Sequence, residues 1–306
     1  MRIFIPMFMC GICLCANAAD DLSAAIANAR TSCGTIGAEL NHMKTMAGIN
    51  TAVTGVGTVA GGVALGTGIA KAGVDKEIED LEKEIEELTQ SGANVPVEPL
   101  TPTNDYTNQA KEFANSYQQR ESELSAAEQK SKTLGNWRTG TLAGATATNI
   151  AGAVIAGTNR VRGDLESQID ECLKSLKTLS AVRMQARIDG TATDAELARA
   201  ENIVRTCENW ATVDVSSINN KSTGATVSAG VGAGLGIAGT ITSASANSQT
   251  VRDGDANKEK NLNTAANVLA GGTTVASGVA TVFNATQIGA IKRAATVADE
   301  CEGALR

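Results

Sequence analysis

Aromatic residues are scarce in this chain of 306 residues, at 3% of the total. A core with so little Phe, Tyr and Trp must be built from Ala, Val, Leu and Ile, so we expect thin elements that approach one another closely. There is a single histidine, His42, which excludes a zinc site of the usual ligand spacing and gives no support to Ser-His-Asp catalysis. The net charge is −7 and no basic stretch could neutralise several phosphates, which argues against nucleic-acid binding.

Proline is nearly confined to one place in the chain. Apart from Pro6, the prolines are Pro96, Pro99 and Pro102. Proline breaks helices, and the residue before it avoids the helical conformation, so residues 91–104 are predicted to form a linker or loop. The absence of proline elsewhere permits very long helices.

The N-terminus has the pattern of a secretory signal peptide. Arg2 supplies the positive charge, residues 3–15 form a short apolar stretch, and 16–18 read Ala-Asn-Ala, a small-residue cleavage site. Removal of residues 1–18 would leave a mature chain that begins at Ala19. The alternative is a buried N-terminal helix. The signal predicts an exported protein of the periplasm or of a cell-envelope membrane.

Four cysteines remain in the predicted mature chain, and an even number in an exported protein suggests two disulfides. Cys207 lies 47 residues before Gly254 and Cys301 lies 47 residues after it, so an antiparallel helix pair would place both at one level. We therefore favour Cys33–Cys172 with Cys207–Cys301. The alternative, Cys172–Cys207 with Cys33–Cys301, stays open because Cys172 and Cys207 are also at similar distances from Gly190.

Apolar residues recur at three- and four-residue spacing, which is typical of amphipathic helices. Asp189-Gly190 is predicted to end one helix, and Thr193 with Glu196 forms a capping box that begins the next. Asp253-Gly254-Asp255 marks a second tight turn. The predicted helices span about 20–90, 105–188, 194–252 and 256–304.

Residues 75–134, on both sides of the proline linker, are predicted to form two arms that pair as a short antiparallel coiled coil. One arm has an apolar stripe among acidic residues, and the other continues the same spacing. The expected contacts set Leu81, Ile85 and Leu88 against Phe113, Tyr117 and Leu124.

The predicted fold is all-α, with two tandem long antiparallel helical hairpins that form a four-helix bundle. The first hairpin is 19–190, including the arms, and the second is 191–306. Both hairpins contain, in the same order, a cysteine, a Gly-Val-Gly, an Asn-x-x-Thr and an Asp-Glu-Cys. This order suggests an internal duplication.

Four segments contain no charged residue: 47–70, 139–159, 222–251 and 261–291. Small residues recur in them at four-residue spacing, the pattern that lets helix backbones touch. The pattern resembles the glycine zippers of membrane and assembly proteins, a resemblance to a motif that names no family. The predicted helix-packing pairs are Gly57/Gly61, Gly62/Gly66, Gly140/Gly144, Gly230/Gly234 and Gly232/Gly236.

Each of these segments is long enough to cross a bilayer core, which needs about 20 residues. Their many Thr, Ser and Asn residues make them marginal spans, so a soluble bundle with a small-residue core is a second interpretation. A strand-rich form of 222–251 is a third. In every case glycine in a water-exposed helix costs about 1 kcal/mol, which favours close packing.

No catalytic or cofactor-binding pattern is present. The glycines at 230–236 lack the Gly-Lys-Ser/Thr ending of a phosphate loop, and the acidic run 77–87 lacks the spacing of a calcium loop. We therefore expect no enzyme and no cofactor, but a structural or assembly protein of the envelope. Its partners would be membrane lipid, and another envelope protein or a second copy bound through the arms. The alternatives are a pore-forming or membrane-perturbing protein and a soluble periplasmic bundle that binds a ligand.

Overall fold

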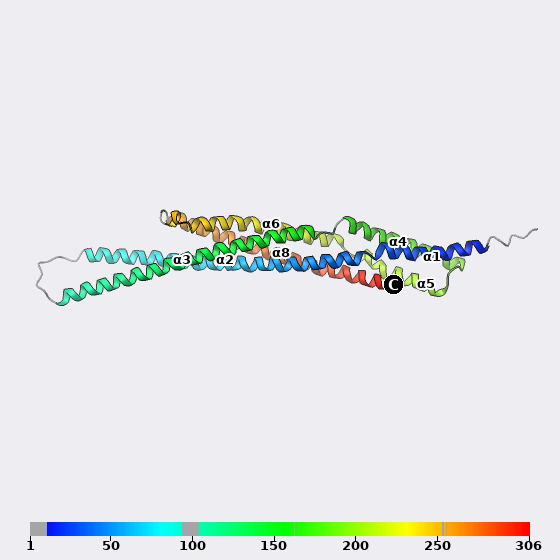
Figure 1. Ribbon diagram of the computed structural model, residues 1–306, viewed down its shortest axis with the longest axis horizontal. Helices are drawn as coiled ribbons and strands as arrows, with labels where there is room; N and C mark the ends of the chain where they lie inside the picture. The colour runs from blue at the N-terminus through cyan, green and yellow to red at the C-terminus, as the bar shows by residue number, and fades with distance from the viewer. Residues whose placement is uncertain (1–10, 94–103, 162, 253, 255) are drawn as a thin grey trace, which may run out of the picture. The chain divides into compact units, whose positions relative to one another are not determined.

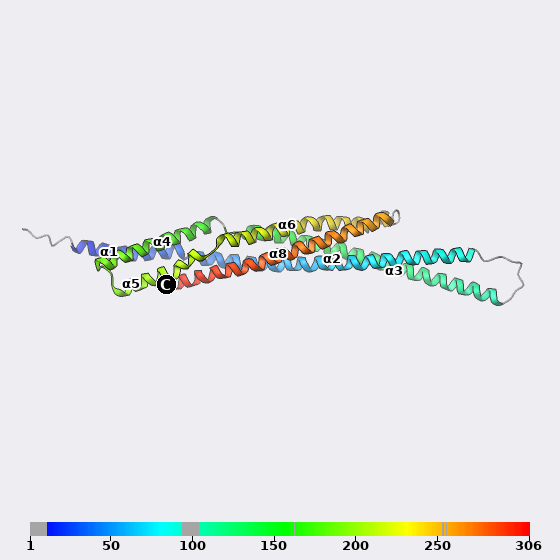
Figure 2. The ribbon, with the colours of Figure 1, turned by 180° about the vertical axis from the view of Figure 1, so that it is seen from behind.

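The computed structural model describes residues 11–93, 104–161, 163–252, 254 and 256–306, and within these ranges every regular element is a helix and none is a strand (Figures 1 and 2). The all-α prediction is therefore confirmed, and 222–251 does not form strands. The elements are α1 (Gly11–Cys33), α2 (Ile36–Ala93), α3 (Asn104–Thr158), α4 (Gly163–Asp189), α5 (Asp194–Cys207), the 3-10 helix η1 (Glu208–Thr212), α6 (Val215–Ala246), α7 (Gln249–Arg252) and α8 (Ala256–Leu305).

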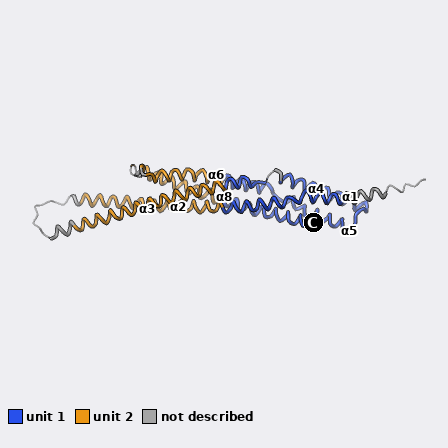
Figure 3. The backbone as a smooth tube through the Cα atoms, viewed as in Figure 1, with its two compact units in different colours: residues 1–52, 152–227, 280–306 blue, residues 53–151, 228–279 orange. Residues whose placement is uncertain are grey.

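The chain forms two compact units, coloured separately in Figure 3. Unit 1 contains 1–52, 152–227 and 280–306, and unit 2 contains 53–151 and 228–279. Each unit thus draws on both halves of the sequence. The division differs from the hairpin ranges 19–190 and 191–306, which stay a prediction.

Three of the four predicted helices are interrupted. The helix predicted at 20–90 breaks at Gly34 and Thr35, the one at 105–188 breaks at 159–161, and the one at 194–252 breaks between η1 and α6 and again at 247–248. The continuous-helix prediction was wrong at these points, which contain no proline. The helix predicted at 256–304 is confirmed as α8.

The break after α3 is stabilised by side chains from other helices of unit 1. Asn159 Nδ2 donates to the carbonyl of Met43 at 3.1 Å, and Gln287 Nε2 donates to the carbonyl of Asn159 at 3.1 Å. The backbone N–H of Val161 donates to Asn219 Oδ1 at 2.8 Å. Polar groups released where the helix ends are therefore bonded again, as buried helix ends require.

The turn from α4 to α5 has the predicted form. Gly190 has φ +62°, the left-handed conformation that favours glycine after a helix, and the N–H of Thr191 donates back to the carbonyl of Ala186 at 3.1 Å. Thr193 and Glu196 make the reciprocal bonds of a capping box at the start of α5. Both predictions are confirmed.

Unit 1 has an ordinary apolar core at its cysteine-bearing end, and α1 and α4 lie side by side there (Figures 1 and 2). Cys33 is bonded to Cys172 with Cα atoms 4.8 Å apart, and Cys207 to Cys301 with Cα atoms 4.6 Å apart. This is the pairing favoured from the sequence, and the alternative pairing is not formed. The largest buried core side chains are Leu22, Ile36, Leu40, Leu165, Leu179, Ile203, Trp210 and Ile291.

Unit 2 has only small apolar clusters, one of which lies at the base of the arms. Leu81 on α2 packs in a cluster with Ala127 and Leu124 on α3, and Arg120 forms an ion pair with Glu84 at 3.0 Å. The two arms therefore pair. Phe113 is 37% exposed and stacks on Tyr117 of its own helix, so its predicted contact with the other arm stays a prediction.

Some predictions fall outside the described residues. These are the first ten residues of the signal peptide, most of the proline linker (94–103), and two of the three residues of the turn at Gly254. Residues 11–18 form the start of α1. Their helical structure does not test whether a signal peptidase removes them, so the cleavage stays a prediction.

Candidate membrane-contact surface and buried polar network

The four charge-free segments have an inverted distribution of side chains. They supply fifteen of the nineteen exposed large apolar residues in the described part of the chain, and twelve of its fifteen buried polar residues. Large apolar side chains therefore lie on the outside of these segments, and their interior combines the polar side chains with small apolar ones, mostly alanine. The exposed residues are Ile49, Val56, Val59, Val63, Ile69, Ile150, Val154, Val227, Val231, Ile237, Ile241, Val268, Val275, Val279 and Val282.

The buried polar side chains bond to one another or to backbone carbonyls. In unit 1, Asn50 Nδ2 donates to Asn284 Oδ1 at 2.8 Å, and Ser222 Oγ donates to the carbonyl of Ala156 at 2.7 Å. In unit 2, Ser277 Oγ donates to Asn149 Oδ1 at 2.9 Å. Buried polar groups normally need such partners, and here they link different helices.

Most threonines of these segments donate their hydroxyl to a carbonyl of their own helix. Thr67, for example, donates to the carbonyl of Val63 at 2.9 Å, and Thr242 to that of Ala238 at 2.8 Å. This bonding leaves the methyl group as the outer part of the side chain. Threonines that do the same include Thr51, Thr58, Thr141, Thr148, Thr158, Thr223, Thr226, Thr240, Thr264, Thr273 and Thr274.

The ten glycines predicted to pack helices fall into two groups. Four lie against another helix of unit 2: Gly57 against Thr148, Gly61 against Thr274, Gly232 against Asn149 and Gly236 against Thr146. An added Cβ at the other six would meet no described atom within 4 Å, so they do not serve close helix contact within the described chain. These six are Gly62, Gly66, Gly140, Gly144, Gly230 and Gly234.

The spacing rule missed several glycines that do allow close approach. A Cβ at Gly68 or Gly135 would overlap Asn267 or Asn247, and one at Gly224 would meet the ring of Phe283 at 2.9 Å. Spacing alone identifies a helix face rich in small residues. It does not say whether that face points toward another helix.

A buried network of charged residues in unit 2 was also missed. The side chain of Lys71 on α2 is 1% exposed, and its Nζ lies 2.7 Å from Asp75 Oδ2 and 2.9 Å from Glu259 Oε1 on α8. Ser131 on α3 also donates to Asp75, at 2.5 Å. One buried cation therefore joins two helices through two carboxylates.

Arg138 on α3 is the second cation of the network, and it is 0% exposed. Its guanidinium donates to Ser243 Oγ at 2.9 Å, to Asn267 Oδ1 at 3.2 Å and to Asn263 Oδ1 at 2.6 Å. These three partners are neutral. Burial lowers the pKa of Arg138, and the charges of Asp75 and Glu259 act in the opposite direction.

Asn263 connects the two cations of this network. Besides accepting from Arg138, its Nδ2 donates to Asp75 Oδ2 at 3.3 Å and to Glu259 Oε1 at 3.4 Å. Lys71, Arg138, Asp75 and Glu259 together are electrically neutral, which is how buried charges are normally accommodated. The sequence signal for the network was weak, because Lys71 and Arg138 stand singly beside charge-free segments while Asp75 and Glu259 lie among other charges.

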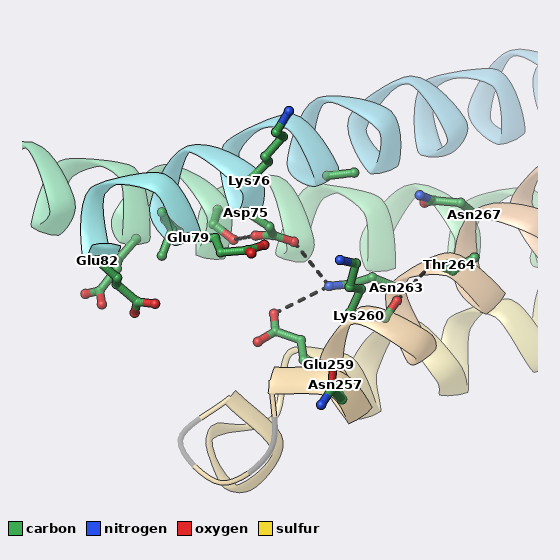
Figure 4. Close-up of a pocket in the computed structure, with 14 residues that line it drawn as sticks. Asp75, Lys76, Glu79, Glu82, Asn257, Glu259, Lys260, Asn263, Thr264 and Asn267 are labelled. Carbon is green, nitrogen blue, oxygen red and sulfur yellow. Dashed lines mark hydrogen bonds between the residues drawn. The ribbon is translucent and has the colours of Figure 1, made fainter. Parts of the chain in front are cut away.

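A groove of about 750 Å³ opens beside the network. Figure 4 shows Asp75, Glu79 and Glu82 on α2 facing Glu259 and Lys260 on α8 across it. Both signs of charge line the groove, and no group of His, Cys, Asp and Glu suited to a metal ion occurs among the described residues. His42 is exposed on α2.

Three helical stretches in the described part of the chain are long and apolar enough to cross a membrane: Asp21–Ser91, Asp194–Ala246 and Asn257–Leu305. The two disulfides are typical of proteins in an oxidising compartment. Comparison with protein families, curated proteins and solved structures finds no match for this chain.

Proposed function

We propose that this chain is an exported structural or assembly protein of a cell envelope, associated with a membrane through its four charge-free segments. In this proposal two tandem antiparallel hairpins, related by duplication, form a four-helix bundle. The observation that carries it is the distribution of side chains in these segments, with large Val and Ile side chains outside and with alanine and most of the buried polar side chains inside.

Lipid suits this distribution better than water does. The exposed Val and Ile side chains, which are 42% to 70% exposed, would each gain part of the about 1.5–3 kcal/mol that full removal from water gives. The six glycines that meet no described atom would each cost about 1 kcal/mol in a water-exposed helix. In a bilayer, helices keep all their backbone hydrogen bonds, and polar side chains face the interior of a bundle.

Export is supported by two independent features. Residues 1–18 have the composition of a signal peptide, and both disulfides are buried in the unit 1 core. Disulfides form and persist outside the reducing cytosol. We therefore place the cysteine-bearing end in the periplasm or another oxidising compartment.

The arms are the proposed partner-binding element. Residues 75–134 contain 14 acidic and 6 basic residues, so they carry a net charge of −8. Such a surface is repelled by anionic lipid and by nucleic acid. Its partner in the proposal is another envelope protein or a second copy of the chain.

Membrane fractionation of the native host tests the proposal. The protein should stay with the membranes after carbonate extraction, and the purified protein should float with liposomes in a density gradient. Release by carbonate together with failure to float would favour the soluble periplasmic bundle and contradict the proposal.

The polar interior favours a second candidate function, a pore-forming or membrane-perturbing protein. Asn, Ser and Thr side chains from different helices meet inside the bundle, as they would beside a water-filled path. Purified protein should then release a dye from liposomes. Flotation without leakage would support the structural role and exclude the pore.

A further inference from the structure

Three of the four charge-free segments end at one level in unit 2. Lys71 directly follows segment 47–70, Arg138 directly precedes 139–159, and Glu259 comes two residues before 261–291. Lys71 binds Glu259, and Arg138 binds Asn263, so these three segment ends lie together. On α2, α3 and α8 the network therefore forms an edge, with charged residues on one side of it and a charge-free segment on the other. The segment 222–251 on α6 passes this level, since Arg138 bonds Ser243 within it.

Trp137 lies on the outside of this edge. Its side chain is 63% exposed, whereas the side chain of the next residue, Arg138, is fully buried. A helix turns by about 100° per residue, so neighbouring side chains point in different directions. The chain thus places its bulkiest apolar side chain outward at the point where the charge-free segment begins.

We propose that the indole of Trp137 lies at the boundary between lipid headgroups and acyl chains. The buried network then marks one edge of the lipid-covered band, and the arms remain in water. The inference depends on the membrane association proposed above, and it adds where on α3 the membrane begins.

Tryptophan is enriched at membrane–water boundaries because its ring is apolar while its N–H seeks polar groups. The residues around Trp137 on α3 divide accordingly. Toward the arms lie the exposed charges of Glu128, Lys130 and Lys132, and on the other side lie the exposed Ile150 and Val154.

Acyl chains fit this surface better than a second copy of the chain does. Exposed apolar residues occur on every long helix of unit 2, for example Val63 on α2, Val231 on α6 and Val275 on α8. A symmetric dimer contact uses one patch of each copy, so it would leave the other helices exposed to water. Lipid surrounds the unit on every side.

Fluorescence quenching by brominated lipids tests the inference, because the sequence has only two tryptophans and Trp210 is 1% exposed in the unit 1 core. The variant Trp210→Phe isolates Trp137, and Trp137→Phe isolates Trp210 as the matched control. In vesicles, Trp137 should lose most of its emission to lipids brominated near the headgroup and less to lipids brominated near the chain end. Trp210 should keep its emission with both.

The outcomes separate the two proposals. Flotation of Trp210→Phe with no quenching of Trp137 would overturn the boundary and leave membrane association standing. Quenching that is strongest near the chain end would also overturn it, because Trp137 would then lie inside the band. Failure to float would overturn both proposals. If Trp210→Phe does not fold, the difference in quenching between the unchanged protein and Trp137→Phe gives the same answer.

Discussion

Asn263 on α8 accepts a hydrogen bond from Arg138 on α3 at 2.6 Å, and through this bond a buried cation reaches two carboxylates that it does not contact. An amide can do this because it accepts at one end and donates at the other. The single side chain of Asn263 therefore holds together the charges of three helices, and it offers the clearest place to test the network.

Asn263→Leu should lower the free energy of unfolding by at least about 2 kcal/mol, because it removes the partner of a buried guanidinium and one donor to each carboxylate. Asn261→Leu is the matched control, since Asn261 is exposed two residues earlier on the same helix. The control should change stability by less than about 0.5 kcal/mol. Chemical denaturation measures both, and equal effects would show that the network contributes little.

Substitution by alanine at two neighbouring glycines should change the stability of the protein in opposite directions. A Cβ at Gly61 would lie 2.7 Å from Thr274 Oγ1 and 3.3 Å from Thr274 Cα, whereas one at Gly62 meets nothing within 4 Å. Gly61→Ala should destabilise the protein by about 1–3 kcal/mol through overpacking. Gly62→Ala should stabilise it by about 0.5–1 kcal/mol through helix propensity. Thermal melting of both variants compares them, and a gain at Gly61 would contradict the α2–α8 contact.

Peptide mapping without reduction should recover Cys33 linked to Cys172 and Cys207 linked to Cys301. Replacing Cys207 and Cys301 with Ala should cost at most about 4–5 kcal/mol, since the bond closes a loop with a sequence separation of 94. Denaturation of the double variant under oxidising conditions measures the loss. A peptide linking Cys172 to Cys207, or four alkylatable thiols in the native protein, would contradict the pairing.

The capping box at α5 should make the start of that helix sensitive to acid. Hydrogen bonds from the backbone N–H and the side chain of Thr193 lower the pKa of Glu196. A lowered carboxyl pKa adds stability above the pKa of the unfolded chain, and this contribution is lost as the pH falls through the folded value. The protection factor of the first turn of α5, which is the exchange rate corrected for the pH dependence of the unfolded amide, should therefore fall as the pH is lowered.

Glu196→Gln should remove this pH dependence of the protection factor, because glutamine does not titrate. Glu171→Gln, at an exposed position on α4, is the control and should leave it unchanged. An unaltered pH profile in Glu196→Gln would show that another group causes the acid sensitivity.

Features with a local or periodic cause could be predicted from the sequence. The end of α4 follows from Gly190, the start of α5 from Thr193 and Glu196, and the length of α8 from its lack of proline. The cysteine pairing followed from distances along antiparallel helices. Each of these signals lies within one helix or within the turn that joins two.

Features that depend on distant contacts could not be predicted. The break after α3 requires Asn219 and Gln287 from two other helices, and neither residue marks a helix end in its own segment. The network has the same origin, since Lys71 and Arg138 look like ordinary flanking charges until Glu259 and Asn263 are placed beside them. The spacing of the glycines also does not indicate which way each glycine faces. Gly61 and Gly62 therefore look equivalent in the sequence.

The threonine hydroxyls that donate to their own helices make the polarity of these segments depend on folding. In an extended chain each of these hydroxyls binds water, and the segment is a modestly polar polypeptide. Helix formation transfers the hydroxyl of Thr67 or Thr242 to a backbone carbonyl and leaves a methyl group outward. An export pathway that handles unfolded chains would therefore meet these segments in a less hydrophobic form than the helical form that later contacts the bilayer.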